Sequence, residues 1–261
     1  MASVTVADGR IRIEQGEGVV VLTFCRPEVR NALDFESMEA LGAFVEELGS
    51  RPDILAVVFA GEGASFVSGG DLRQLAALKS EEAGRSLSRR GGQILRDLES
   101  LPQTTIAAIG GDAYGGGVEL ALACDMRIIE RSSSLGLVQA RLGLCTAWGA
   151  GVRLQRMLGY ARALELLIEA GCVDAQRAWD LGLVNRVVED GEALPSAVAL
   201  AAKVVSLTRP VAMGIKAVLK GAEVLDVDDA MAEERRIFGQ LWGSELHQEK
   251  VAEFLRKSRP R

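Results

Sequence analysis

The same order of features occurs twice in the first half of the chain: an apolar strand pattern, a glycine-rich turn and the start of a helix. The first copy, AVVFAGEGASFVSGGDLRQL, covers residues 56–75, and the second, TIAAIGGDAYGGGVELALAC, covers residues 105–124. Consecutive glycines, as at 115–117, are costly in conformational entropy and seldom lie inside a helix. Their position at a helix start indicates that another group approaches the backbone closely there.

Each turn would present backbone N–H groups at the beginning of a helix. The first donors of a helix have no partner within it, and the helix dipole is positive there. Two such donors, one from each turn, could hold a single oxygen atom, which is the geometry of an oxyanion hole. Glycines at such turns also serve tight packing alone, and this alternative stays open for either turn. A phosphate-binding loop is a further alternative, but the sequence has neither GxxxxGK(S/T) nor a GxGxxG fingerprint in a Rossmann unit.

The hydrophobic pattern predicts strands alternating with helices up to about residue 148 and almost only helices after it. The predicted strands are 11–14, 19–24, 54–60, 105–109, 126–129, 134–137 and a short one near 183–188, with a loop at 61–65. The predicted helices begin at 34 or 37 and run to about 48, and then cover 72–77, 81–98, 118–124, 152–158, 161–168, 175–181, 193–207, 211–221, 229–242 and 248–257. The chain is therefore expected to form one α/β core with a C-terminal helical cluster that folds over it or over a neighbouring subunit.

Composition excludes several classes of function. Hydrophobic residues make up 48% of the 261 residues and charged residues 25%, which is typical of a globular protein with a core. The net charge of −6 comes without a basic patch, so we expect no nucleic-acid partner. Apolar runs such as 19–24 are too short to cross a bilayer, so we expect no membrane partner.

The cysteine and histidine content points to a cytoplasmic protein without a metal site. The chain has no secretory signal pattern at its N-terminus. Its four cysteines, Cys25, Cys124, Cys145 and Cys172, form no CxxC pair, and we expect them to be buried free thiols. The single histidine, His247, argues against both a His-rich zinc site and a Ser-His-Asp triad.

Four segments spread over nearly the whole chain carry a family resemblance. They are FCRPEVRNAL (24–33), FAGEGASFVSGGDLRQL (59–75), AIGGDAYGGGVELALACDMRI (108–128) and LGLVQARLGLCTAWGAGVRLQRMLG (135–159), and the ending EFLRKSRPR also fits. In this order and spacing they resemble the enoyl-CoA hydratase/isomerase (crotonase) superfamily. The resemblance implies an α/β crotonase (ClpP-like) fold, a spiral of ββα units with a C-terminal helical cluster. It implies a core at 1–193 and, at 194–261, a helical segment for oligomerisation and part of the CoA site.

The resemblance also implies a substrate and an assembly. The substrate would be an acyl-CoA thioester, with coenzyme A as part of the substrate and no separate cofactor, and the protein would form a homo-trimer or a hexamer built as a dimer of trimers. Gly70 and Gly116 match the two oxyanion donors, and Glu119 matches a catalytic carboxylate. The residues matching the CoA site are Arg26, Glu28, Arg30, Ala32, Phe66 and Ser68, together with Phe254 and Lys257 from a neighbouring subunit. Asp71 is grouped with them, although we expect it to be a helix N-cap rather than a proton shuttle.

Gln139 departs from the pattern of the family's hydratases, which use two carboxylates that share a water. Glu119 matches the first, but the second position, four residues before Gly143, holds Gln139, whose amide cannot serve as a general acid or base. Glu119 also has a purely structural alternative, because an acid in the first turn of a helix stabilises the dipole.

Three alternatives for the activity therefore stay open. The first is a hydratase or isomerase that stabilises a thioester enolate in the oxyanion hole. The second is a decarboxylase of a short malonyl-type CoA, such as methylmalonyl- or ethylmalonyl-CoA. In it, Gln139 would hydrogen-bond the substrate carboxylate and Glu119 would protonate the enolate. Residues 144–154, LCTAWGAGVRL, are similar to a TPSWGG-type segment of ethylmalonyl-CoA decarboxylase-like members and favour this alternative. The third is an inactive CoA-binding homologue.

Overall fold

The structure is a computed structural model that describes residues 2–257. The chain forms two compact units, the first ending at Lys203 and the second beginning at Val204. The division expected from the sequence, between residues 193 and 194, concerns roles in assembly and CoA binding, and those roles stay a prediction. Part of the ending EFLRKSRPR, residues 258–261, lies outside the described residues.

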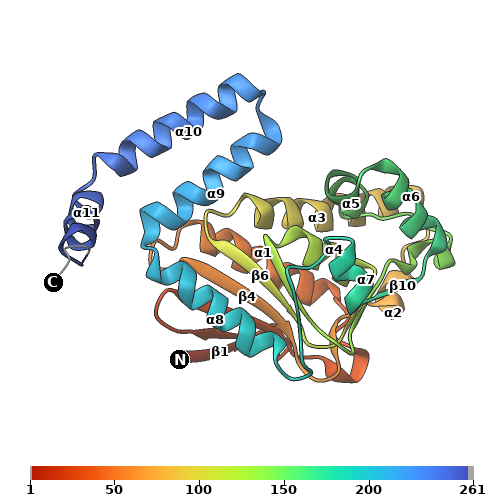
Figure 1. Ribbon diagram of the computed structural model, residues 1–261. Helices are drawn as coiled ribbons and strands as arrows, with labels where there is room; N and C mark the ends of the chain where they lie inside the picture. Colours follow the sequence, from red (N-terminus) through yellow and green to blue (C-terminus); the bar gives the residue numbers. More distant parts are fainter. Residues whose placement is uncertain (1, 258–261) are drawn as a thin grey trace. The chain divides into compact units, whose positions relative to one another are not determined.

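A seven-stranded sheet in the order β1-β2-β3-β4-β6-β8-β11 forms the centre of the first unit (Figure 1). Its strands β1 to β3 are antiparallel neighbours, and those from β3 to β11 are parallel. Their bounds are β1 Ala2–Val6, β2 Ile11–Gln15, β3 Val19–Phe24, β4 Ala56–Gly61, β6 Thr104–Ile109, β8 Met126–Glu130 and β11 Arg186–Val188. The central strands are buried along almost their whole length, as their continuous apolar runs predicted.

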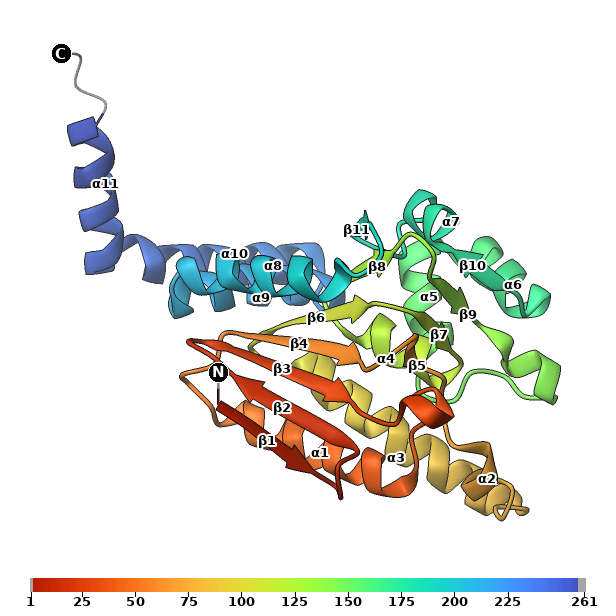
Figure 2. The ribbon, with the colours of Figure 1, turned by 90° about the horizontal axis from the view of Figure 1, so that it is seen from below.

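A second sheet of four short strands, in the order β10-β9-β7-β5, accompanies the first (Figure 2). Its strands are β5 Ser65–Val67, β7 Asp112–Tyr114, β9 Ser134–Gly136 and β10 Cys172–Asp174. Each of β4, β6 and β8 in the large sheet is followed along the chain by a strand of the small sheet and then by a helix. This repetition is the spiral of ββα units that the resemblance implied, and the predicted fold is confirmed.

Helices α1 (Phe35–Gly49) and α3 (Glu81–Ser100) lie side by side along the large sheet (Figure 2). Asp34 caps α1 by accepting a hydrogen bond from the Ser37 amide at 2.8 Å, so the earlier of the two predicted starts is correct. Met38, Leu41 and Val45 are spaced on one face of α1 and are buried. The other helices of this unit are η1 Pro27–Val29, α2 Leu72–Leu75, α4 Gly116–Ala123, η2 Val138–Leu142, α5 Ala150–Leu158, α6 Tyr160–Glu169 and α7 Ala175–Asp180, and α8 (Ala193–Ser206) contains the junction of the two units.

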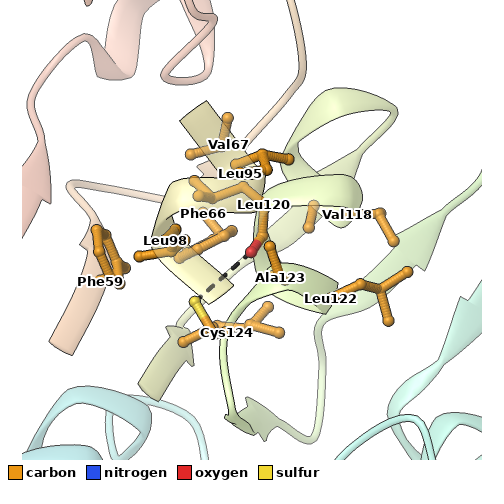
Figure 3. Packing of buried hydrophobic residues seen from close by; sticks show 14 of the residues in the cluster. Phe59, Phe66, Val67, Leu95, Leu98, Val118, Leu120, Leu122, Ala123 and Cys124 are labelled. Atoms are coloured by element: carbon orange, nitrogen blue, oxygen red, sulfur yellow. Dashed lines mark hydrogen bonds between the residues drawn. The ribbon is translucent and has the colours of Figure 1, made fainter. Parts of the chain in front are cut away.

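The short helix α4 is buried on all sides, which is why its sequence VELALA shows no polar face. Figure 3 shows its Leu120 among Phe66 and Val67 of β5 and Leu95 and Leu98 of α3. A helix surrounded in this way cannot shift without opening the core, because protein interiors are close-packed. The packing therefore fixes the position of the triglycine at its N-terminus.

The second unit contains α9 (Arg209–Val224), α10 (Val227–Trp242) and α11 (Glu245–Lys257). Helices α9 and α10 pack against each other, and Gly214 lets Ile237 and Leu241 approach closely. Among the described residues no single helix is long and apolar enough to cross a membrane. Only α8 and α9 taken together reach that length and composition.

Two expectations about local structure were wrong. Residues 61–65 were expected to form a loop, but Ser65 begins strand β5. The four cysteines were expected to be buried, but only Cys124 is, whereas Cys145 and Cys172 are exposed and Cys25 is half-buried. Burial, together with a hydrogen bond to Glu62, raises the pKa of Cys25 to about 11, so its thiol stays protonated at neutral pH.

Candidate active site

Three neighbouring parallel strands bring the predicted site residues together. β5 pairs with β7, and β7 pairs with β9, all in the same direction. The segments that follow these strands carry Gly70, Gly116 with Glu119, and Gln139 respectively. Because the carboxyl ends of parallel strands meet at one edge of a sheet, residues about 70 positions apart in the sequence meet there.

The backbone on both sides of Gly70 is held by Leu33. The Leu33 amide donates to the Gly69 carbonyl at 2.7 Å, and the Asp71 amide donates to the Leu33 carbonyl at 2.9 Å. Gly70 is thus the bridge partner of Leu33, and its own N–H points away from Leu33. Asp71 caps α2 by accepting from the Arg73 amide at 3.1 Å, as expected from the sequence.

Each glycine of the triglycine has its own geometric reason. Gly115 has φ +50° and ψ −115°, a combination that side chains disfavour. A Cβ on Gly116 would overlap the ring of Trp148, and a Cβ on Gly117 would overlap the Val67 carbonyl of β5. The turn is therefore glycine-rich for close approach, and the approaching groups at Gly116 and Gly117 belong to the protein itself.

The two glycine turns are in contact, and both present an unpaired donor. A Cβ on Gly69 would lie 3.1 Å from the Gly116 nitrogen. Within residues 2–257, neither the Gly70 nor the Gly116 amide donates a hydrogen bond. Both glycines are half-buried, and two free donors in adjoining turns offer a site for an external acceptor.

Glu119 is buried, and its carboxylate accepts four hydrogen bonds. Oε2 accepts from the amides of Trp148 at 2.7 Å and Ala150 at 3.0 Å, and Oε1 accepts from the Ala147 amide at 3.1 Å and from Nε2 of Gln139 at 3.2 Å. Glu119 thus caps the start of α5 rather than its own helix. Its acceptor sites are filled, so a proton or water can reach it only if one donor moves, and Gln139 is the only side chain among the four donors.

Gln139 and Trp148 each keep one buried polar atom without a partner in the described structure, Oε1 and Nε1 respectively. Trp148 is held firmly, because its amide bonds Glu119 and its carbonyl accepts from Arg153 Nη1 at 2.7 Å. Its ring lies against Gly116 of α4 and Gly91 of α3. Trp148 therefore adjoins the Gly116 donor through its ring and the carboxylate through its backbone.

Asp112 fixes the strands that carry these groups. Its carboxylate accepts from the Tyr114 hydroxyl at 2.9 Å and from the Ser134 amide and hydroxyl at 2.9 and 2.8 Å, which ties β7 to β9. Burial and the hydrogen bond to Asp112 raise the pKa of Tyr114, so its hydroxyl remains a donor at neutral pH.

The residues predicted to bind CoA differ in their exposure and in their contacts. Glu28 and Arg30 are exposed, and Ala32 is buried beside them in the loop after β3. Phe66 is a core side chain in contact with Phe24, and the Ser68 amide donates to the Arg30 carbonyl at 3.0 Å. Arg26 instead contacts Ala32, Asp34 and Asp71. In the second unit Phe254 is exposed, and Lys257 pairs with Glu253 at 2.8 Å.

The sequence alone did not reveal that Glu119 bonds the amides of Ala147, Trp148 and Ala150, because strands β8 and β9 and helix η2 separate α4 from this segment along the chain. The spacing of Gly91, Gly116 and Trp148 likewise carries no local signal. Within the described part of the chain, no cluster of three or more His, Cys, Asp or Glu side chains is placed to bind a metal ion.

Comparison with known proteins identifies the family to which this site belongs. The sequence model of the enoyl-CoA hydratase/isomerase family matches residues 14–261. The chain belongs to this family. It is an acyl-CoA-processing enzyme of the enoyl-CoA hydratase/isomerase type, as the resemblance implied.

Individual relatives cover almost the whole chain. The short-chain-enoyl-CoA hydratase of Clostridium acetobutylicum is 34% identical over 248 residues, which are 94% of each chain. The ethylmalonyl-CoA decarboxylase of Danio rerio is 33% identical over 91% of this chain and 80% of its own. The solved structure of an enoyl-CoA hydratase from Bacillus anthracis superposes with a TM-score of 0.90 over 97% of this chain and 98% of its own, at 29% identity.

Proposed function

We propose that this protein adds water to a short 2-enoyl-CoA thioester, using two backbone amides and a single carboxylate. The observation that carries the proposal is the pair of unpaired amides, Gly70 and Gly116, in two touching turns. The thioester oxygen accepts hydrogen bonds from both, and they stabilise the negative charge that develops there as water adds. Removing one such donor costs about 2.7–4 kcal/mol of transition-state stabilisation in other enzymes.

Glu119 handles the proton in this proposal. The Gln139 amide swings away from Oε1 of Glu119, and a water takes the vacated place with its other hydrogen on Oε1 of Gln139. Glu119 accepts a proton from this water as the hydroxide oxygen bonds to C3 of the enoyl group. The same proton then passes from Glu119 to C2 as the enolate collapses, so one carboxylate serves in both steps and water is the only reactant consumed.

The position of the Trp148 side chain favours a substrate with a short acyl group. An acyl chain whose carbonyl lies at the Gly116 amide and whose C3 lies near Glu119 must pass this residue. The backbone amide and carbonyl of Trp148 are both hydrogen-bonded, and its indole fills the space between α3 and α4 next to Gly116. The hydratase of Clostridium acetobutylicum, named for short-chain enoyl-CoA, agrees with this size.

The CoA part of the substrate would lie along the loop after β3, near Glu28, Arg30 and Ala32 and the backbone at Phe66 and Ser68. Phe254 and Lys257 of a neighbouring copy would contact the nucleotide, in a homo-trimer or a hexamer. Coenzyme A enters as part of the substrate, and the proposed chemistry needs no separate cofactor.

A substrate panel tests the proposal. The purified protein is incubated with crotonyl-, 2-hexenoyl- and 2-decenoyl-CoA and with methylmalonyl- and ethylmalonyl-CoA, and the products are weighed by mass spectrometry. We expect crotonyl-CoA to gain one water, fastest of the three enoyl thioesters. Absence of hydration of every enoyl-CoA would contradict the proposal, and no turnover on the whole panel would favour the inactive homologue.

One observation favours the decarboxylase as a second candidate. The position of a second carboxylate holds Gln139, which can bond a substrate carboxylate without repelling it, and the decarboxylase of Danio rerio is 33% identical. In this reaction the C–C bond to the carboxylate breaks, CO₂ leaves, and the enolate held by the two amides takes a proton at C2 from a protonated Glu119, which regains its proton from water. Release of CO₂ from ethylmalonyl-CoA in the same panel identifies this activity.

A further inference from the structure

Arg26 follows β3, and its guanidinium joins three parts of the structure around Gly70. Nη1 donates to the Ala32 carbonyl at 2.7 Å and lies 3.1 Å from Oδ2 of Asp34, and Nη2 donates to Oδ2 of Asp71 at 3.1 Å. The Asp34 carboxylate also accepts from Arg10 Nε at 2.8 Å. Only 19% of the Arg26 side chain is exposed, so its donors are directed at the protein rather than at solvent.

These contacts surround the backbone bridge that orients Gly70. Ala32 and Asp34 flank Leu33, and Asp71 follows Gly70. Leu33 fixes the two peptide groups next to Gly70 through its hydrogen bonds at 2.7 and 2.9 Å. The guanidinium therefore connects both sides of the bridge, with charge-assisted hydrogen bonds that are stronger than neutral ones.

We propose that Arg26 is a positioning residue for the Gly70 amide and not a ligand of CoA. The inference rests on the proposed role of Gly70 as an oxyanion donor. An oxyanion hole works because its donors are already in place when charge develops. Without Arg26 the bridge would loosen, and the Gly70 N–H would have to reorganise during each turnover.

Positioning and CoA binding predict opposite kinetic effects. A misplacement of about 1 Å can cost about 100-fold in rate, so a positioning role predicts that Arg26→Gln lowers kcat 10- to 100-fold. The KM for the acyl-CoA and the Kd for free CoA should change less than about twofold, since no CoA contact is lost. A ligand of CoA would instead raise Kd and KM with kcat preserved.

The experiment compares Arg26→Gln and Arg26→Lys with Arg51→Gln. Like Arg26, Arg51 pairs with two carboxylates, Asp53 at 2.7 Å and Glu47 at 3.3 Å, but it has no part in the site. We measure kcat and KM on the acyl-CoA that the wild type converts, and Kd for CoA by calorimetry. Arg26→Lys should recover part of kcat, and Arg51→Gln should leave all three constants unchanged. A tenfold rise in Kd with unchanged kcat in Arg26→Gln overturns the proposal.

A second measurement does not depend on catalysis. Hydrogen–deuterium exchange of the Leu33 and Asp71 amides, which form the bridge, should be faster by about tenfold or more in Arg26→Gln than in Arg51→Gln, at equal global stability. Unchanged exchange at these two amides overturns the positioning role. If the wild type converts no acyl-CoA, the proposed function fails, and the exchange result still decides the role of Arg26.

Discussion

Trp148 connects the two chemical parts of the site at the scale of one residue. Its ring fills the space that a side chain at Gly116 would need. Its amide makes the shortest of the four hydrogen bonds to Glu119, at 2.7 Å. The backbone contact survives substitution of the side chain, whereas the ring contact does not. The size of the side chain at position 148 can therefore be varied while the donor to Glu119 is retained.

Shortening Trp148 should change which acyl chain is converted. We expect Trp148→Leu to raise kcat/KM for 2-decenoyl-CoA relative to crotonyl-CoA by tenfold or more, because space opens between α3 and α4. The cavity should also lower the free energy of unfolding by about 3 kcal/mol. Trp148→Phe, which keeps most of the ring, serves as the control. An unchanged ratio of the two substrates in Trp148→Leu would place the acyl chain elsewhere.

Asp34 gives a prediction on acid stability. Burial alone would raise its pKa, but hydrogen bonds from Ser37 and Arg10 and the charge of Arg26 outweigh burial and lower it. A carboxyl with a lowered pKa in the folded state contributes stability above its unfolded pKa of about 3.9 and loses that contribution as the pH falls through the folded value. We expect Asp34→Asn to lower the Tm at pH 7 and to flatten the fall of Tm below about pH 4. Parallel curves for the two proteins across this range would refute the assignment.

At the scale of elements, the start of α5 depends on a residue of α4. α5 has Gly149 as its N-cap and no side-chain cap of its own, so the Glu119 carboxylate replaces it. Ser88 of α3 adds a hydrogen bond to the Ala147 carbonyl at 2.7 Å, and Arg153 pairs with Glu99 of α3 at 2.8 Å. Two helices from distant parts of the sequence, α3 and α4, thus hold the start of α5 against the site.

Loss of this anchor should be measurable as stability. Glu119→Ala leaves three backbone amides without an acceptor, and two of them, those of Trp148 and Ala150, are buried. We expect the free energy of unfolding to fall by about 3 kcal/mol or more. Gln139→Ala removes only one donor and keeps the carboxylate, so its loss should be about 1 kcal/mol. Denaturant unfolding of the two variants gives both values. Equal losses would show that the backbone contacts of Glu119 contribute little.

Features whose signals are local could be predicted from the sequence, whereas features that arise from tertiary contacts could not. Long periodic elements, such as α1 with its Asp34 cap and the β-branched strand β4, were predicted because their signals are local. Strands β5, β7 and β10 have three residues each and were not predicted, and they exist through pairing within the small sheet. Strands β9 and β11 are as short but were predicted. The sequence placed the two glycine turns next to each other, and Gly69 does lie against Gly116, but the partners of Glu119 and Arg26 come from tertiary contacts that no spacing encodes.

At the scale of the whole molecule, the second unit exposes many large apolar side chains. Leu219, Val224, Val227, Phe238 and Trp242 on α9 and α10 are each more than half exposed. Exposed apolar surface of this extent is unusual in a monomer and is typical of an interface. It agrees with the proposed trimer or hexamer, in which another copy covers these helices.

Light scattering coupled to size-exclusion chromatography tests the assembly. We expect a mass of three or six chains for the wild type, and a shift to a smaller mass for Phe238→Glu, because a charge would be buried in the interface. Glu234→Gln, an exposed change on the same helix, serves as the control. A monomeric wild type would contradict the assembly and, with it, the contribution of Phe254 and Lys257 to a neighbouring site.

In the proposed hydration Glu119 alone moves the proton while Gln139 only holds the water, and a comparison of three proteins checks these two roles. The rate of crotonyl-CoA hydration is measured for wild type, Glu119→Gln and Gln139→Ala, with CoA binding and melting temperature recorded for each. We expect kcat to fall by about 10²–10⁴ in Glu119→Gln, the usual range for a lost general acid–base. In Gln139→Ala, which loses one hydrogen bond, we expect a fall of less than about tenfold. A Glu119→Gln variant that binds CoA, stays folded and hydrates crotonyl-CoA at the wild-type rate would contradict the proposed role of Glu119.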